Sequence, residues 1–373
     1  MYKMIGPFPF RAGDTFPPPA RQTRLILVTF VMALAVCVLL WASTSLNVGA
    51  EGGRGGSAGG VVVPLPPPTI VARTAVVQGP DLSAMCTMVM GKLIASAPAT
   101  EWPPPCPLPE AMRAAFEGPD RSMPNSRDYC QAQRYEGELV VDWNEAFVTK
   151  YCAGLAAGTA TGSYRAVDDE LVRRVLLSVP GMVGSTGMVL GSERPWVECF
   201  ALNAGAATVW TFEYATVVST HPRLKAKPCK IMAAEHVSGA LPLVDWIATY
   251  SSLEHSGLGR YGDALNPDGD KEALLQALCM LKPGGILLLG LPTTCKPDGY
   301  LEFNSHRIYG FKRLAYITEG FELVRFAGPC VAPPTEIAAN IIVLRKPSVG
   351  PAPMMLTSDD FQRAALLASG VSA

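Results

Sequence analysis

A glycine and an acidic residue 22 positions later form the first pair whose spacing suggests chemistry. Gly191 ends the apolar run "GMVLG", and Glu213 ends the run "ATVWTFE". In an open α/β sheet, an acid about 20 residues after the first glycine turn is placed to bind the hydroxyls of a nucleoside ribose. A surface position for Glu213 stays open as the alternative, because "GSERPW" has one glycine where a glycine-rich loop would have more.

Two histidines are candidates for proton transfer. His255 lies in "SSLEHSG" beside Glu254, and His306 lies in "FNSHRIYG" beside Arg307. If a hydroxyl group is the acceptor in a reaction, a base must take its proton. Capping of backbone groups is an equally good interpretation for His255. For His306 we favour catalysis or substrate binding, and Arg307 is a candidate to bind the substrate with it.

The polar loop "HSGLGRYGDALNPDGD" supplies three more candidates to contact a substrate: Arg260, Tyr261 and Asp263. A solvated loop is the alternative. The same loop contains Asp268 and Asp270, which could hold a divalent metal ion and a sugar diphosphate in a glycosyltransferase. Because these acids precede a helix, helix N-terminal acids explain them more simply, and we expect no metal site.

Alternating elements must position these residues. Short aliphatic runs predict parallel strands, and helix-length amphipathic segments between them predict crossover helices. We expect helices at 168–179, 194–205 and 271–281, and strands at 187–191, 207–213, 230–234, 243–250 and 286–290. The runs 321–326 and 340–347 are close together and predict an antiparallel pair.

The stretch "LCMLKPGGILLLGLP" shows how one such boundary is encoded. Lys282 complements a helix C-terminus, and Pro283 prevents another turn. Gly284 and Gly285 allow the chain to turn back into the sheet. The uniformly apolar "ILLLG" then predicts a strand buried on both faces.

The N-terminal part predicts a membrane anchor. Leu25 to Ala42 is an 18-residue run without a charge, which would span about 27 Å as a helix. Basic residues dominate before it, so we expect a cytoplasmic N-terminus and a lumenal body. A cleaved signal peptide and a buried soluble helix are the alternatives. The predicted parts are a tail (1–24), a transmembrane helix (25–42), a Gly/Pro-rich stem (43–69), an extension of undefined role (70–165), an α/β domain (166–346) and a C-terminal tail (347–373).

Composition excludes one class of partner. With 31 basic and 32 acidic residues and a pI near 6.4, the chain has no electrostatic footprint for nucleic acid. Nine cysteines follow the predicted anchor, and a lumenal compartment would permit disulfides between them. Their spacing fits no zinc motif. Cys199 and Cys279 fall in predicted helices, where we expect small buried hydrophobic residues.

Several segments carry a resemblance. "LVDWIATYSSLEHSG" and "ALLQALCMLKPGGILLLGLP" resemble the fourth strand, the following helix and the fifth strand of class I S-adenosylmethionine-dependent methyltransferases. "GSERPWVECFALNAGAATVWTFEY", "SSLEHSGLGRYGD" and "FNSHRIYG" resemble more closely a family of unknown activity, domain of unknown function 268. The resemblance covers about residues 165 to 346. It implies a Rossmann-like fold with a mostly parallel seven-stranded sheet and an antiparallel C-terminal strand.

The resemblance also implies a cofactor, S-adenosylmethionine, and positions for it. Gly191, Ser192 and Glu193 would lie at its amino-acid end and Glu213 at its ribose. Ser251 and Ser252 would border it. We therefore expect a single-pass membrane protein of the Golgi or endoplasmic reticulum whose lumenal domain methylates a hydroxyl group of a glycan, a small molecule or another secretory-pathway acceptor. A glycosyltransferase and a non-catalytic methyltransferase-like binding module are the alternatives.

Overall fold

The computed structural model describes residues 82–96, 104–118, 120, 122–130, 140–328, 330, 338–348 and 355–369. Within these ranges, no helix is long and apolar enough to cross a membrane. The predicted transmembrane helix at 25–42, the tail before it and the stem after it lie outside the described residues.

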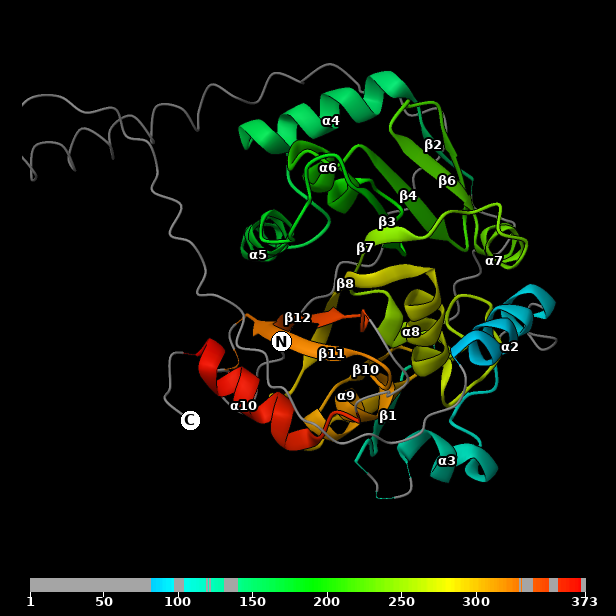
Figure 1. Ribbon diagram of the computed structural model, residues 1–373. Helices are drawn as coiled ribbons and strands as arrows, with labels where there is room; N and C mark the ends of the chain where they lie inside the picture. The colour runs from blue at the N-terminus through cyan, green and yellow to red at the C-terminus, as the bar shows by residue number, and fades with distance from the viewer. Residues whose placement is uncertain are drawn as a thin grey trace, which may run out of the picture. The chain divides into compact units, whose positions relative to one another are not determined.

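Seven strands form one sheet in the order β11-β12-β8-β7-β3-β4-β6 (Figure 1). Only β12 runs antiparallel to its neighbours in this sheet. The order from β6 to β8 is the 3-2-1-4-5 order of a doubly wound sheet, which reverses direction between β3 and β7. This is the α/β methyltransferase-like fold that the resemblance predicted. The strands are β3 (Thr186–Leu190), β4 (Thr208–Glu213), β6 (Leu224–Pro228), β7 (Val244–Tyr250), β8 (Leu281–Thr293), β11 (Glu322–Ala327) and β12 (Ala338–Arg345).

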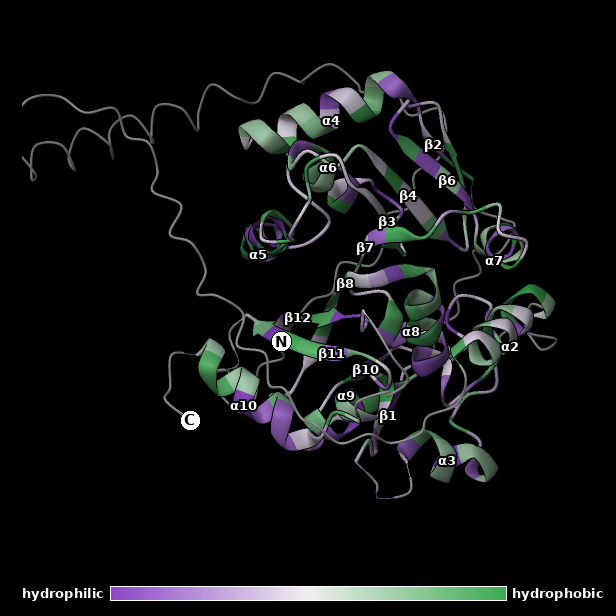
Figure 2. Cartoon of the chain, in the orientation of Figure 1, coloured by the Kyte–Doolittle hydropathy of each residue, from purple (hydrophilic) through white to green (hydrophobic). Residues whose placement is uncertain are grey.

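Helices cover both faces of the sheet because side chains of a strand alternate between them. In β3, Val189 packs on one face, whereas Met188 and Leu190 pack on the other. The Val189 face carries α4 (Glu145–Ala157), α5 (Ala166–Leu177) and α6 (Trp196–Asn203). The other carries α2 (Leu82–Ala95), α7 (Cys229–Val237), α8 (Gly269–Met280), α9 (Phe311–Ile317) and α10 (Ser358–Ala368). In Figure 2, α10 carries both hydrophobic and hydrophilic colour, as expected of a helix with one buried face.

The predicted third strand, 230–234, is wrong. These residues belong to helix α7, and the strand is the preceding segment β6. Cys229, Met232 and Ala233 are the buried residues of α7, and their spacing of three and four positions is helical. The segment "LKAKP" was overlooked because it is polar. Two lysines are acceptable there because β6 is an edge strand of the sheet.

The helix-to-strand boundary at Lys282 is sharper than predicted. Helix α8 ends at Met280 and β8 begins at the next residue. The Nζ atom of Lys282 pairs with Asp245 Oδ1 at 2.6 Å, across the strand pair, so its partner is a side chain of β7. Gly284 has φ +77°, which is the conformational freedom that the sequence predicted for it.

Smaller elements surround the sheet. The strands β1 (Asn125–Asp128), β9 (Tyr300–Phe303) and β10 (His306–Ile308) form a three-stranded sheet, with α3 (Glu110–Glu117) against it. The strands β2 (Val140–Trp143) and β5 (Thr216–Ser219) pair in parallel. The β9–β10 hairpin follows β8, and β10 contacts a short 3₁₀ helix, η1 (Leu253–His255), that follows β7. The hairpin therefore lies at the carboxyl edge of the large sheet.

The described parts of the predicted extension and C-terminal tail pack on the sheet domain. Helix α2 contacts α7 and α8, α4 contacts α6, and α10 contacts α9 and β11. All of them belong to one compact unit, Leu65–Ala373.

Four disulfides connect these elements. They join Cys86 to Cys279, Cys106 to Cys130, Cys152 to Cys199, and Cys295 to Cys330. The interpretation of Cys199 and Cys279 as merely small buried residues is therefore wrong. Each faces a cysteine on a helix distant in sequence, and spacing along the chain cannot reveal such a pairing.

Candidate functional site

The carboxyl ends of β3 and β7 meet at the point where the strand order reverses. Gly191 directly follows β3 and has φ +73°, a conformation that favours glycine. A Cβ atom placed on Gly191 would lie 1.8 Å from Ser252 Oγ. Gly191 and Ser252 are thus in direct contact. Any side chain at position 191 would clash with the Ser252 side chain.

Glu213, at the end of the adjacent strand β4, bonds to the loop after Gly191. Its Oε2 atom accepts a hydrogen bond from the Ser192 amide at 2.7 Å, and its Oε1 atom accepts from the amides of Tyr214 (2.6 Å) and Ala215 (3.4 Å). Burial raises the pKa of the Glu213 carboxyl group. A carboxylate offers about four acceptor positions, so Oε2 can still accept one further donor. The arrangement fits a ribose hydroxyl.

Glu198 supports this loop, and the sequence analysis missed it. It is completely buried in α6, where its Oε2 atom accepts from Ser192 Oγ at 3.0 Å and its Oε1 atom accepts from Thr211 Oγ1 at 2.9 Å. Burial raises the pKa of Glu198 to about 7. The available signal was an acid inside the otherwise apolar run "WVECFAL". Glu198 fixes Ser192, while the side chain of Glu193 is exposed next to it.

Ser251 and Tyr164 lie beside the contact between Gly191 and Ser252. Ser251 has φ +51°, and its Oγ atom donates to Glu254 Oε1 at 2.7 Å. Its carbonyl accepts a hydrogen bond from the Tyr164 hydroxyl at 3.4 Å. The Tyr164 ring packs on Trp196 and Tyr250, with centroids 5.8 and 5.1 Å away. Tyr164 precedes α5, so only the tertiary structure brings it to this edge.

The two candidate histidines lie together, with ring centroids 6.1 Å apart. The Nδ1 atom of His255 lies 2.5 Å from the Ser305 carbonyl oxygen. Because a carbonyl only accepts, Nδ1 carries the proton and Nε2 is the unprotonated nitrogen of the neutral ring. Burial, together with the nearby charge of Arg260, lowers the pKa of His255 to about 3. His255 is therefore a weak base.

His306 is paired with a carboxylate, that of Glu302. Its Nε2 atom lies 3.1 Å from Glu302 Oε2, and its Nδ1 atom lies 3.0 Å from Ser305 Oγ. The interaction with His306 lowers the pKa of Glu302. Glu302 and His306 are opposite each other in the antiparallel pair of β9 and β10. Glu302 was not predicted as a site residue, because the pairing of β9 with β10 was not recognised in the sequence.

The remaining candidates differ in their surroundings. Arg260 and Tyr261 lie against the histidines: the guanidinium carbon of Arg260 is 5.2 Å from the Tyr261 ring centroid, and the Tyr261 and His255 ring centroids are 5.4 Å apart. Asp263 accepts hydrogen bonds from the amides of Gly257 (2.7 Å), Gly259 (3.3 Å) and Tyr261 (3.3 Å) and so holds the loop.

Arg307 is buried, with 1% of its surface exposed, and donates to backbone carbonyls of the loop. The nearest, of Ser256, is 2.6 Å away, and those of Asn266 and Pro267 follow at 3.3 and 3.2 Å. The guanidinium therefore fixes the loop, which leaves it poorly placed to bind an acceptor.

Asp270 is the centre of a buried ionic cluster. Its Oδ1 atom lies 2.5 Å from Arg313 Nη2, its Oδ2 atom accepts from the Tyr309 hydroxyl at 3.1 Å, and Arg307 Nε is 3.6 Å away. Burial alone would raise the pKa of Asp270, but Arg307 and Arg313 hold it below its usual value. Both carboxylate oxygens are occupied, and in the described part of the chain no three His, Cys, Asp or Glu residues are grouped to hold a metal ion.

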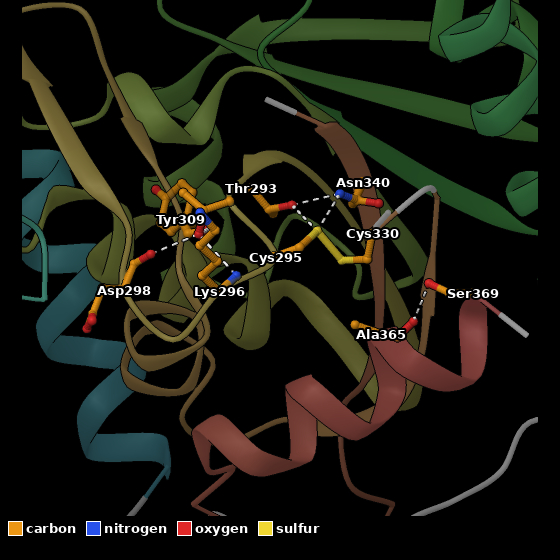
Figure 3. Close-up of a disulfide and its surroundings, with 10 residues drawn as sticks. Thr293, Cys295, Lys296, Asp298, Tyr309, Cys330, Asn340, Ala365 and Ser369 are labelled. Carbon is orange, nitrogen blue, oxygen red and sulfur yellow. Dashed lines mark hydrogen bonds between the residues drawn. A yellow bond between two sulfur atoms is a disulfide. The ribbon is translucent and has the colours of Figure 1, made fainter. Parts of the chain in front are cut away.

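A disulfide fixes the chain where it leaves β8 (Figure 3). Cys295 follows the end of β8 and pairs with Cys330, which follows β11. Beside it, Asn340 Nδ2 donates to Thr293 Oγ1 at 2.7 Å (Figure 3). These links constrain the segment that leads from β8 to the hairpin carrying His306.

Residues 184–342 match the model of a protein family described as "Caenorhabditis protein of unknown function, DUF268". This match confirms the family resemblance found in the sequence. No curated protein matches the chain.

Solved methyltransferases are similar to part of the chain. The 1,6-didemethyltoxoflavin-N1-methyltransferase of Burkholderia thailandensis shares 14% identity over 54% of this chain and 87% of its own, with a TM-score of 0.36. The N-methyltransferase NodS of Bradyrhizobium japonicum shares 15% identity over 48% of this chain and 96% of its own, with a TM-score of 0.33.

Proposed function

We propose that this protein is an S-adenosylmethionine-dependent methyltransferase that methylates a hydroxyl group of a glycan or of another acceptor in the secretory pathway. The observation that carries the proposal is the convergence of Gly191, Ser252 and Glu213 at the point where the strand order reverses. Ligands of open α/β sheets bind at this point, and an acid at the end of the second strand is suited to a ribose.

The residues of this edge divide the binding of the cofactor among them. The Glu213 carboxylate accepts hydrogen bonds from the ribose hydroxyls, and Gly191 lets the backbone approach the cofactor closely. Ser192 and Glu193 border the amino-acid end together with Gly191, and Ser251 and Ser252 border the cofactor at the end of β7. When bound, S-adenosylmethionine supplies an electrophilic methyl group, so the protein must chiefly align the acceptor and exclude water. The Tyr164 ring, packed over the end of β7, helps to exclude water.

His306 is the better candidate for the base. Glu302 accepts the Nε2 proton of the neutral ring, which leaves Nδ1 to take a proton from the acceptor hydroxyl, directly or through Ser305 Oγ. The Glu302 carboxylate then stabilises the imidazolium. The low pKa of His255 makes that ring a hydrogen-bond acceptor at neutral pH, so it orients the acceptor. Arg260 and Tyr261 line the same place.

The disulfides support the compartment. Four disulfides within one α/β domain are typical of secreted and lumenal proteins and rare in the cytosol. They agree with the orientation that the N-terminal sequence predicts, with a single membrane anchor, a cytoplasmic N-terminus and a body in the lumen of the endoplasmic reticulum or Golgi. Glycans are abundant hydroxyl acceptors there, which is the reason for naming this acceptor class.

The geometry disfavours the glycosyltransferase alternative. Asp270 would need a free carboxylate oxygen to bind a metal ion, and Arg313 and Tyr309 occupy both of its oxygens. The remaining alternative is a binding module that holds the cofactor or its product without transferring a methyl group.

The experiment is a calorimetric titration of the full chain, purified in detergent, with S-adenosylmethionine and S-adenosylhomocysteine. We expect saturable binding that Glu213→Gln weakens by about 10- to 100-fold, because a hydrogen bond to a charged group is worth about 1.5 to 3 kcal/mol. Glu322→Gln on the edge strand β11 is the matched control and should bind normally. A folded protein that binds neither ligand would exclude the proposal, and binding of a sugar nucleotide with manganese instead would favour a glycosyltransferase.

A further inference from the structure

Arg260 is a buried cation without a counter-ion at ion-pair distance. Its exposed fraction is 8%, yet within the described part of the chain it forms no ion pair. Among those residues, the one hydrogen bond of Arg260 is long, 3.4 Å from Nη1 to Ser305 Oγ, and its Nε atom has no partner. Burying an unpaired charge is costly, so a ligand that supplies the missing charge would explain the residue.

The other two buried arginines of the described residues show what a structural arginine looks like in this protein. Arg307 donates to loop carbonyls and lies 3.6 Å from Asp270. Arg313 donates to both oxygens of Asp270, at 2.5 and 3.2 Å. Among the described residues, the partners of Arg260 are the Ser305 hydroxyl and the Tyr261 ring, 5.2 Å from its guanidinium carbon, and neither supplies the negative charge that Arg307 and Arg313 have in Asp270.

Two more buried polar atoms without a hydrogen-bond partner among the described residues belong to the same cluster. They are Glu254 Oε2 and Asn304 Oδ1. Glu254 lies one residue before His255, and Asn304 lies two residues before His306. Buried polar groups are nearly always hydrogen-bonded, so three such atoms around one pair of histidines indicate a polar ligand.

We propose that Arg260 binds a carboxylate of the acceptor, so that the methylated hydroxyl belongs to an acidic sugar such as a uronic or sialic acid. This inference rests on the proposed methyltransferase function. A guanidinium matches a carboxylate through two parallel hydrogen bonds, and the Nε donor that such a pair uses is unpartnered here. Burial raises the pKa of the Glu254 carboxyl group, whereas the charges of His306 and Arg260 lower it.

The position of Arg260 favours the acceptor over the cofactor. Its one hydrogen bond is to Ser305 Oγ, which also contacts Nδ1 of His306, the nitrogen assigned as the base. The cofactor's own carboxylate is expected at Ser192 and Glu193, after β3. A carboxylate bound by Arg260 therefore places a neighbouring hydroxyl next to His306.

The test uses the full chain saturated with S-adenosylhomocysteine. Two acidic probes, a glucuronic acid disaccharide and sialyllactose, are titrated beside the same sugars with the carboxylate reduced to an alcohol. Methyl transfer from S-adenosylmethionine to each sugar is measured in a separate assay without S-adenosylhomocysteine. We expect binding and transfer with at least one acidic probe and about 10- to 100-fold less with its reduced form.

Three variants separate the possible roles of Arg260. Arg260→Gln should bind the acidic probe about 10- to 100-fold more weakly and keep its affinity for S-adenosylhomocysteine. It should melt at an equal or higher temperature, because an unpaired buried charge is removed. Arg260→Lys should retain part of the binding. Arg307→Gln, the contrast, should melt at a lower temperature.

The outcomes that overturn the inference are distinct from failure of the proposed function. Loss of S-adenosylhomocysteine affinity in Arg260→Gln would assign the residue to the cofactor. Equal use of acidic and reduced sugars, or use of neither by protein that binds S-adenosylhomocysteine, would exclude the acidic acceptor. A lower melting temperature with unchanged sugar preference would show a structural role. Wild-type protein that does not bind S-adenosylhomocysteine would reject the methyltransferase proposal and this inference with it.

Discussion

His255 and His306 are neighbours with different electrostatic surroundings. His306 Nε2 lies 3.1 Å from the Glu302 carboxylate, whereas His255 lies near the charge of Arg260, with Nε2 3.9 Å from Glu254 Oε1 and Nδ1 facing a backbone carbonyl. Two residues of the same type, both at the carboxyl edge of the sheet, are thereby suited to different tasks. The proposed assignment, with His306 as the base, follows from this difference and can be tested one residue at a time.

His255 is expected to stay neutral at physiological pH. Burial and Arg260 lower its pKa to about 3, so its ring signals in an NMR titration should not shift between about pH 8 and pH 5. Because the pKa in the folded protein lies below the ordinary histidine value of 6.5, the neutral ring stabilises the fold above that pH. This contribution is lost as the pH falls from about 6.5 toward 3. A midpoint near 6.5 would show a solvated ring.

Replacing His306 should affect the chemical step. We expect His306→Asn to reduce methyl transfer by about 100- to 10,000-fold while the affinity for S-adenosylhomocysteine stays the same. His221→Asn, at the turn before β6, is the control and should transfer normally. Unchanged transfer by His306→Asn would move the role of base to another residue, with Glu254 the next candidate.

Asp270 should be a stability residue and not a ligand. Asp270→Asn removes the buried counter-ion that Arg307 and Arg313 share and leaves Arg313 only the exposed Asp268, 3.6 Å away, so we expect a loss of about 3 to 5 kcal/mol in unfolding free energy at neutral pH. The pKa of Asp270 in the folded protein is below the ordinary aspartate value of 3.8, so the wild-type protein loses this stabilisation as the pH falls below about 4. Denaturant unfolding at two pH values measures both effects. A difference between the two proteins that does not shrink in acid would contradict this account.

At the scale of elements, the junction of β3 and β7 depends on a glycine. Gly191→Ala should combine the strain of a positive φ with a clash against Ser252. Gly184→Ala is the matched control, because Gly184 also has a positive φ, +78°, but a Cβ there meets nothing within 4 Å. We expect Gly184→Ala to lose about 1 to 2 kcal/mol and Gly191→Ala to lose clearly more.

A double variant isolates the clash. Ser252→Gly added to Gly191→Ala should recover most of the excess loss, since the Ser252 side chain supplies the obstructing atoms. Thermal unfolding of the wild type, the two single variants Gly191→Ala and Ser252→Gly, and the double variant measures the coupling between the two positions. Additive effects would show that Gly191 and Ser252 are not in contact.

Elements with a clear hydrophobic period were predictable, and one edge strand was not. The apolar residues of β7 and β8 mark buried strands because both faces are covered by helices. The polar β6 lies at the edge, where burial is incomplete and the pattern disappears. The apolar "KIMAA" therefore seemed the better strand, although its buried positions are spaced as in a helix.

For the whole molecule, the disulfides are expected to be structural. Cys86 and Cys279 join α2 to α8 across 193 residues of sequence. Removing a crosslink that closes so long a loop by Cys86→Ser with Cys279→Ser should reduce the unfolding free energy by about 3 to 5 kcal/mol. Denaturant unfolding measures this loss, and peptide mapping without reductant checks the four pairs. Reduced cysteines in full-length protein isolated from the membranes of eukaryotic cells would contradict both the pairing and the compartment.

The sequence by itself determined the layered α/β architecture, because alternating apolar runs and amphipathic segments have one compact arrangement as a sheet covered by helices. It also located Gly191, Ser252 and Glu213, since the carboxyl ends of parallel strands share one edge. Glu198, Glu302 and Tyr164 were not predictable from local pattern. Their roles depend on contacts between segments that are far apart or on the pairing of a hairpin.

Only the tertiary structure decided which polar residues serve the fold and which are left without partners. The sequence offered Asp263 and Arg307 as substrate contacts and explained Asp270 as a helix N-terminal acid, and the structure shows all three bonded to backbone groups or to each other. Arg260 looked no different, yet it is buried and has no counter-ion at ion-pair distance among the residues that the structure describes. The physical reason is that charge compensation depends on distance in space, and residue types along the chain specify which charges exist but not which of them meet.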